Sequence, residues 1–91
     1  MNRILVMLTI DLDNLPSNFP HIVAQEREVV ARWKKDGFIE QFYLRPKRDG
    51  AVMIFKDKTE VEVQEWLATL PFYPLRKSLD VVPLIQDLEL S

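Results

Sequence analysis

Glu26 is a carboxylate at a position where the sequence predicts an apolar surface. It follows Ile22 by four residues and precedes Val29 and Val30 by three and four, so it falls within the apolar stripe of an expected helix. Partial burial raises the pKa of a carboxyl group and suits it to move protons near neutral pH. The alternative is a structural glutamate that reaches the rim of the stripe or pairs with Arg27 or another cation. Periodicity alone does not choose between these two interpretations.

Two further side chains could contact a substrate, His21 and Tyr43. His21 is the only histidine, and it falls in the first turn of the same expected helix, where a surface or capping role is commoner than catalysis. The Tyr43 hydroxyl would orient a substrate, and the alternative for this ring is to fill the core. Strand alternation places Tyr43 on one face with Ile39, Gln41 and Arg45.

A short basic run follows the segment of Tyr43 and contains Arg45, Lys47 and Arg48. Such a run would attract a substrate that carries a carboxylate. A solvated hairpin loop is the commoner explanation, so the run by itself does not define a binding site.

The composition excludes several kinds of site. The chain has no cysteine, which rules out disulfides and thiol catalysis and fits a reducing compartment, so we expect a cytoplasmic protein. The single histidine and the scattered acidic residues give no metal-ligand spacing, and there is no glycine-rich phosphate loop. With 12 basic and 14 acidic residues the formal charge is −2, which disfavours nucleic acid as a partner. We therefore expect neither a metal nor an organic cofactor.

The length of 91 residues, 47% of them hydrophobic, predicts a single domain that spans residues 1–91. The apolar N-terminal segment could pass for a signal peptide, but Asp11 and Asp13 follow at once, so we interpret it as a strand. No segment approaches the roughly 20 apolar residues of a membrane span. A small domain without disulfides or a metal usually gains stability from a partner subunit.

Six elements are expected, in the order strand, helix, strand, strand, helix, strand. Gly37 stops the first helix, and Thr59 with Glu62 forms a capping-box pattern at the start of the second. Asp49 and Gly50 indicate a hairpin turn. The expected strands cover residues 3–12, 38–45 and 51–55 and lie within 77–85, and the expected helices cover residues 20–36 and 59–70.

The first and third expected strands are apolar on both alternating sets of side chains, which is typical of central strands. Right-handed crossovers then place both helices on one face of a four-stranded antiparallel sheet, giving an α+β fold of βαββαβ order. The helices can cover only one face of this sheet. We expect the same face of a second copy of the chain to cover the other.

A leucine-proline pair, an aromatic-proline pair and a late proline-leucine pair occur within residues 70–77 and 82–84. This arrangement resembles the C-terminal signature of muconolactone isomerases. The resemblance covers almost the whole chain. The same order and closely similar spacing are shared by Leu15-Pro16, the helix with Glu26, Gly37 and the strand that ends in Ile54-Phe55.

The resemblance implies a ferredoxin-like unit that pairs through its sheet as a dimeric α/β barrel, often within larger rings. It also implies a bacterial catabolic reaction in which a proton moves to shift the double bond of an unsaturated lactone, without metal or organic cofactor. Glu26 falls where the family carries a helix glutamate, and Tyr73 falls in the aromatic-proline motif. The second strand departs from the family, with Gln41, Tyr43 and Leu44 where His, Trp and Arg are expected.

The leading hypothesis is a muconolactone-isomerase-like enzyme in which Glu26 shuttles a proton on a small lactone or related carboxylated metabolite. Tyr43, Arg45 and Tyr73 would orient the ligand in a cleft between helices and sheet, with His21 as a further candidate contact. Two alternatives stay open on the same barrel, a non-catalytic binding or assembly module and a cofactor-free monooxygenase. The expected partners are a second copy of the chain and a small molecule, not nucleic acid or a membrane.

Overall fold

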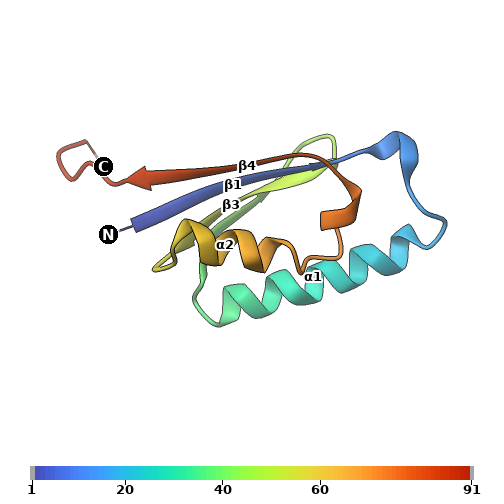
Figure 1. Cartoon of the computed structure of the whole chain (residues 1–91), viewed down its shortest axis with the longest axis horizontal. Helices are drawn as coiled ribbons and strands as arrows, with labels where there is room; N and C mark the ends of the chain where they lie inside the picture. The colour runs from blue at the N-terminus through green and yellow to red at the C-terminus, as the bar shows by residue number, and fades with distance from the viewer. Residues whose placement is uncertain (1, 91) are drawn as a thin grey trace.

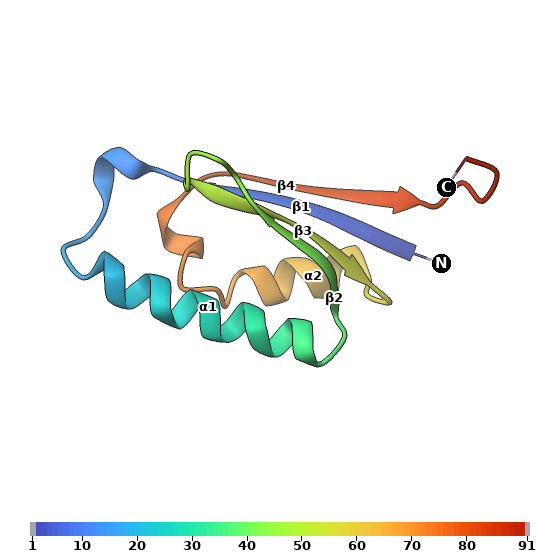
Figure 2. The same cartoon turned by 180° about the vertical axis from the view of Figure 1, so that it is seen from behind.

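The computed structural model describes residues 2–90, which form one antiparallel sheet in the order β2-β3-β1-β4 with both α-helices on one face (Figures 1 and 2). This confirms the expected α+β class and the ferredoxin-like βαββαβ arrangement. Within the described residues, no helix is long and apolar enough to cross a bilayer. The elements are β1 (Asn2–Ile10), α1 (Phe19–Lys35), β2 (Ile39–Leu44), β3 (Gly50–Lys56), α2 (Glu60–Leu67) and β4 (Arg76–Ile85), with short 3-10 helices at Leu12–Asn14 and Tyr73–Leu75.

The C-terminus of α1 and the N-terminus of α2 are set by the residues that the sequence indicates, whereas α2 ends at Leu67, before the expected end at residue 70. Gly37 follows α1 with a φ of +82°, a left-handed conformation that glycine adopts without strain. Thr59 caps α2, because its hydroxyl accepts a hydrogen bond from the Glu62 N–H at 3.1 Å while the Glu62 carboxylate accepts one from the Thr59 N–H at 3.1 Å. This confirms the predicted capping box.

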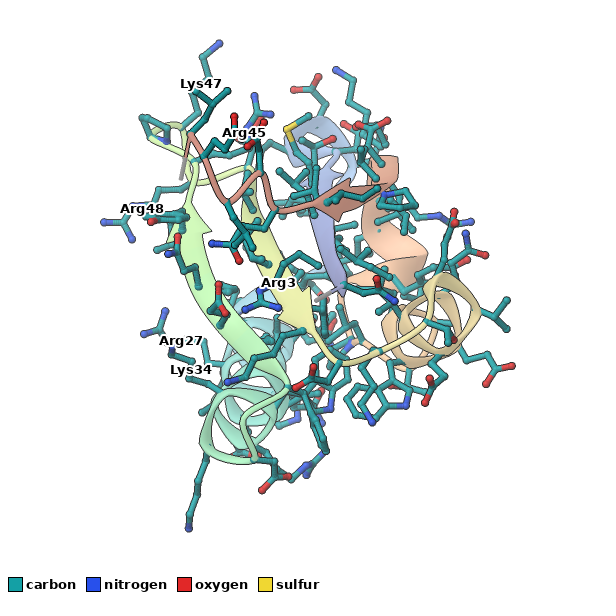
Figure 3. All side chains as sticks on the ribbon, turned by 90° about the vertical axis from the view of Figure 1, so that its left-hand side faces the viewer. Arg3, Arg27, Lys34, Arg45, Lys47 and Arg48 are labelled. Atoms are coloured by element: carbon teal, nitrogen blue, oxygen red, sulfur yellow. The ribbon has the colours of Figure 1, made fainter. Side chains whose placement is uncertain are left out.

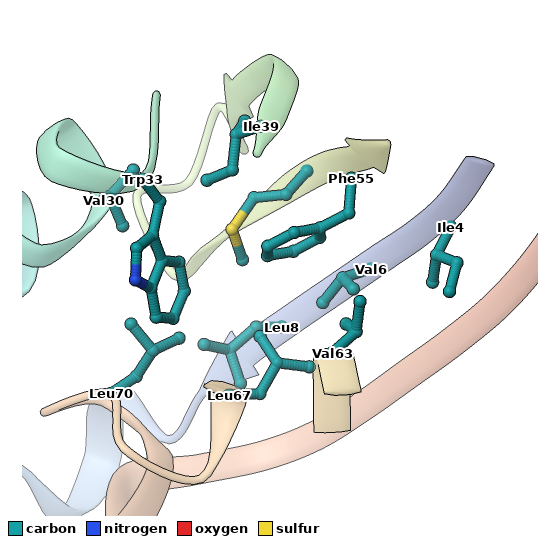
Figure 4. Close-up of a cluster of buried hydrophobic side chains, with 11 residues drawn as sticks. Ile4, Val6, Leu8, Val30, Trp33, Ile39, Phe55, Val63, Leu67 and Leu70 are labelled. Carbon is teal, nitrogen blue, oxygen red and sulfur yellow. The ribbon is translucent and has the colours of Figure 1, made fainter. Parts of the chain in front are cut away.

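The hydrophobic core lies between the helices and the face of the sheet that they cover, here called the inner face (Figure 4). Alternate residues of β1 and β3 point into it, as the period of a strand requires. Val6 and Phe55 on the sheet and Val63 on α2 are 0% exposed. The other members of the cluster are Ile4, Leu8, Val30, Trp33, Ile39, Met53, Leu67 and Leu70.

The opposite side of the sheet, here called the outer face, carries no helix (Figures 1 and 2). Leu5 and Met7 on β1 pair with Ile54 and Val52 on β3, and all four side chains are half-buried. Val82 on β4 extends this apolar surface and is 43% exposed. The expectation that both central strands are apolar on both faces is therefore confirmed.

The pairing of β2 with β3 shifts register between Ile39 and Gln41. Because of this bulge, Ile39 lies opposite the buried Phe55 and points to the inner face, where it is 2% exposed. Strict alternation predicts that Ile39 shares a face with Tyr43, and this prediction is wrong. Alternation resumes after the bulge, so Gln41 and Tyr43 lie on the outer face.

Candidate active site

A largely apolar cavity of about 810 Å³ lies between α1 and the β2-β3 hairpin. Its volume falls within the range of sites that hold small molecules. Phe19 and Val23 from α1 and Phe42 and Leu44 from the inner face of β2 contribute to its walls, and Phe72 completes them from the segment after α2. The rings of Phe19 and Phe72 stack with centroids 5.8 Å apart and planes inclined by 12°. Stacked aromatic rings thus form part of the cavity wall.

Glu26 is the buried carboxyl group of this cavity, and its side chain is 7% exposed. One carboxylate oxygen, Oε1, accepts a hydrogen bond from the backbone N–H of Phe72 at 3.0 Å. None of the ion pairs within residues 2–90 includes Glu26, so the structural alternative in which it pairs with Arg27 is wrong. A single backbone N–H fixes this carboxyl group and leaves its charge unneutralised.

Burial raises the pKa of Glu26 from 4.5 to about 7, and the hydrogen bond from Phe72 opposes only part of this shift. Both protonation states are therefore populated at neutral pH. By contrast, hydrogen bonds from the backbone N–H and the hydroxyl of Thr59 lower the pKa of the half-buried Glu62, which stays ionised at neutral pH. Glu26 can accept a proton and return it, and Glu62 is suited to capping a helix.

Two of the predicted site residues lie near Glu26 in the sequence or the fold without lining its cavity. His21 is exposed in the first turn of α1 and is not part of the cavity wall. Tyr73 is half-buried in the 3-10 helix, where the guanidinium of Arg76 lies 3.9 Å from its ring centre. Its neighbour Phe72 contacts Glu26 instead.

Tyr43 and Arg45 lie on the far side of the sheet from Glu26. The Tyr43 side chain is 57% exposed on the outer face, and its hydroxyl donates to Gln41 Oε1 at 2.7 Å. Arg45 pairs with Asp49 at 3.0 Å and approaches the sulfur of Met7 at 3.6 Å. The prediction of one cleft that contains these residues and Glu26 is wrong within a single chain, because the sheet separates them. Their roles toward a substrate stay predictions.

Three cations line the cavity, namely Arg27, Lys34 and Arg48. Arg48 belongs to the basic run that the sequence offered as a possible attraction for a carboxylate, whereas the sequence analysis assigned Arg27 and Lys34 no role toward a ligand. Arg27 and Lys34 are seven residues apart and therefore lie on the same side of α1. Arg48 comes from the hairpin loop, where its φ of +59° is left-handed. In Figure 3 these three side chains extend on one side of the molecule, while Arg45 and Lys47 lie at another edge. The sequence signal for Arg27 and Lys34 was their seven-residue spacing, which places both on the side of the helix next to Glu26.

The Glu26 carboxyl is the group of this site that can transfer a proton. Within residues 2–90, no set of three or more His, Cys, Asp or Glu side chains is placed to hold a metal ion. A carboxyl group that titrates near neutral pH in an apolar cavity can take a proton from a carbon acid and deliver it to another atom of the same ligand.

The sequence and the structure of this chain were compared with those of known proteins. No family model and no curated protein sequence matches the chain. Its structure is similar to the crystal structure of a muconolactone isomerase, with a TM-score of 0.78 and 20% identity over 94% of this chain and 91% of that one.

Two other solved structures are similar to this chain. One is 5-chloro-2-hydroxyhydroquinone dehydrochlorinase from Burkholderia phenoliruptrix in complex with 2,5-dihydroxybenzoquinone, with a TM-score of 0.59 and 12% identity over 93% of each chain. The other is an antibiotic biosynthesis monooxygenase, with a TM-score of 0.59 and 15% identity over 96% of this chain and 99% of that one. At these identities the likeness is one of fold, and the chain has the fold of muconolactone isomerase that its sequence resemblance implies.

Proposed function

We propose that this protein is an isomerase that shifts a double bond in a small unsaturated lactone or related ring compound, with Glu26 as both base and acid. The observation that carries the proposal is the buried Glu26 carboxyl, whose pKa is raised to about 7 in an apolar cavity of ligand size. The similarity in fold to muconolactone isomerase supports the choice of a lactone.

The reaction needs one proton carrier and no change in the formula of the ligand. The Glu26 carboxylate removes a proton from a saturated ring carbon, and the electron pair of that C–H bond moves into the conjugated lactone as a dienolate. The Glu26 carboxylic acid then returns the proton to a different carbon, and the double bond moves. The Phe72 N–H holds the carboxyl in place during both steps. A pKa near 7 favours both transfers at neutral pH.

The substitution Glu26→Gln tests this role, because it preserves the size of the side chain and removes the titratable group. We expect the rate of muconolactone isomerisation, followed by NMR, to fall by about 10²- to 10⁴-fold, the usual contribution of a general acid or base. In deuterium oxide the wild-type product should retain at least part of the transferred hydrogen as protium, because Glu26 returns the proton that it removed.

The matched control is Glu65→Gln, which changes an exposed carboxylate on α2 outside the cavity. It should leave the rate unchanged. Activity that survives Glu26→Gln would contradict the proposed role. Oxygen consumption with a hydroquinone substrate would instead favour a monooxygenase, and saturable binding without any turnover would favour a non-catalytic module.

We also propose that the chain forms a homodimer through its outer face. Leu5, Met7, Val52 and Ile54 form a half-buried apolar surface on two central strands, and covering it with the same face of a second copy removes it from water. Ile54→Lys should therefore give a monomer in light scattering at micromolar concentration.

The matched control for the dimer is Val61→Lys, which changes an apolar residue that is 65% exposed on α2, outside the sheet. This variant should remain dimeric, because α2 is not part of the outer face. A monomeric wild type at micromolar concentration would contradict the proposed dimer.

A further inference from the structure

We propose that the stacked rings of Phe19 and Phe72 form a clamp that holds the Phe72 N–H against the Glu26 carboxyl. The two phenylalanines are then positioning residues of the reaction, because they act through Glu26. This inference rests on the proposed function and adds to it the contact that orients the proton carrier.

Glu26 depends on one residue for its orientation. The Phe72 N–H, 3.0 Å from Oε1, is the one hydrogen-bond donor to this carboxyl among residues 2–90. None of the ion pairs within the same residues includes Glu26. The other charged side chains of the cavity wall are exposed, namely Arg27, Glu28, Lys34 and Arg48. Whatever places the backbone of Phe72 therefore also places the proton carrier.

Phe72 belongs to a connecting segment and not to a regular element. It lies between α2 and the 3-10 helix Tyr73–Leu75, beside the N-terminal half of α1 (Figures 1 and 2). The Tyr73 N–H donates to the Leu70 carbonyl and the Leu75 N–H donates to the Phe72 carbonyl, both at 2.9 Å. These bonds lie within the segment, so they do not fix its distance from α1.

The stack of Phe19 on Phe72 supplies the link to α1. Phe19 and Glu26 are seven residues apart, about two turns of helix, so both side chains leave α1 on the same side. The Phe72 ring meets the Phe19 ring with centroids 5.8 Å apart and planes inclined by 12°, while the Phe72 N–H meets Glu26. Phe72 is thus attached to α1 at two points, one apolar and one polar.

The residues before Phe72 make this link effective. Leu70 is 2% exposed and anchors the segment in the core. Pro71 restricts the backbone between Leu70 and Phe72, because its ring fixes φ. The ring contact therefore has few backbone conformations to select among. A carboxyl that is held in this way keeps its oxygens directed at the ligand during both proton transfers, which a rotating carboxyl would not do.

Phe19→Leu and Phe72→Leu test the clamp, because each removes one ring and both keep the N–H of residue 72. In the wild type, the NMR signal of the Phe72 amide should shift with the protonation of Glu26, with a midpoint near pH 7. In both variants this pH-dependent shift should be lost, and the amide should exchange with solvent about tenfold faster or more. The kcat for isomerisation should fall about tenfold in each.

The double variant distinguishes a clamp from two separate pieces of cavity wall. If the two rings act as a unit, Phe19→Leu combined with Phe72→Leu lowers kcat by about the same tenfold as either single change. Independent contributions would multiply to about 100-fold. Phe19→Tyr keeps a stacking ring and should therefore preserve both the titration of the Phe72 amide and the rate.

The matched control is Phe42→Leu, which removes another half-buried ring of the cavity wall. Phe42 is not part of the stack, so the Phe72 amide should titrate and exchange as in the wild type. The clamp would be overturned by a wild-type Phe72 amide that does not respond to pH, by an unchanged amide in Phe19→Leu, or by multiplying rate effects in the double variant.

The NMR measurements need no substrate, so they separate this inference from the proposed function. A Phe72 amide that titrates in the wild type and not in the two leucine variants, without any isomerisation, would refute the proposed function and leave the clamp standing. Isomerisation that requires Glu26 but proceeds at the wild-type rate in both leucine variants would refute the clamp alone.

Discussion

The layer between the helices and the sheet is filled in one half and hollow in the other. In the filled half, the aromatic rings pack closely around Trp33. The ring centre of Trp33 lies 5.4 Å from that of Trp66 and 5.9 Å from that of Phe55. The ring of Phe38 packs edge-on against Trp66, with the ring centres 4.7 Å apart. Between α1 and the β2-β3 hairpin, the same layer leaves a cavity of about 810 Å³ and buries the carboxyl of Glu26. The packed half therefore contributes more apolar contact to stability than the hollow half does.

The cations of the two halves show the same difference. In the packed half, Lys58 Nζ lies 4.3 Å from the ring centre of Phe38 and 4.9 Å from that of Trp66, so its charge already has aromatic contacts. In the hollow half, Arg27 and Arg48 face the cavity without an ion pair among residues 2–90. The cation of the packed half contacts aromatic rings, whereas these two arginines line an open cavity.

Phe55→Ala should lower the free energy of unfolding more than the other substitutions, because it removes a large buried side chain from the packed half. Phe55 is 0% exposed, and its loss removes apolar contacts and leaves a void. We expect the free energy of unfolding to fall by about 4 kcal/mol in urea titrations monitored by circular dichroism. A loss below about 1 kcal/mol would show that this half is not the main source of stability.

Glu26→Gln should change how the free energy of unfolding depends on pH, because it removes the titratable group of the hollow half. The pKa of Glu26 is raised from 4.5 to about 7 in the folded state, so the folded protein holds this proton more tightly than the unfolded chain. The proton on Glu26 therefore stabilises the folded state fully below pH 4.5, and this stabilisation is lost as the pH rises through 7.

Wild-type stability should therefore fall relative to the variant by about 3 kcal/mol between pH 4.5 and pH 8. Unfolding titrations at both pH values measure this difference. Parallel pH profiles of the two proteins would show that the hollow half does not hold a carboxyl with a raised pKa.

Phe42→Ala makes the same chemical change as Phe55→Ala, but in the wall of the cavity. Phe42 is half-buried, and the space beside it is already open, so less apolar contact is lost. We expect the free energy of unfolding to fall by only about 1 kcal/mol. A loss equal to that of Phe55→Ala would remove the distinction between the two halves.

The sequence predicted the elements and the inward position of Glu26 because these depend on local patterns. Residues that recur at helical spacing place Glu26 on the apolar stripe, whatever the rest of the chain does. The capping box of Thr59 and Glu62 is set by a spacing of three residues. Double apolar patterns on the first and third strands also predicted that β1 and β3 are central.

The tertiary structure alone decided which side chains accompany Glu26. The Phe72 N–H that fixes it lies 46 residues away in the sequence. The path of the chain after α2 brings Phe72, and not the neighbouring Tyr73, within hydrogen-bond distance of Glu26. The left-handed turn at Arg48 separates it from Arg45, although the two belong to one basic run. A periodic pattern fixes the face of an element, but contacts between distant segments depend on turns and packing that no local pattern encodes.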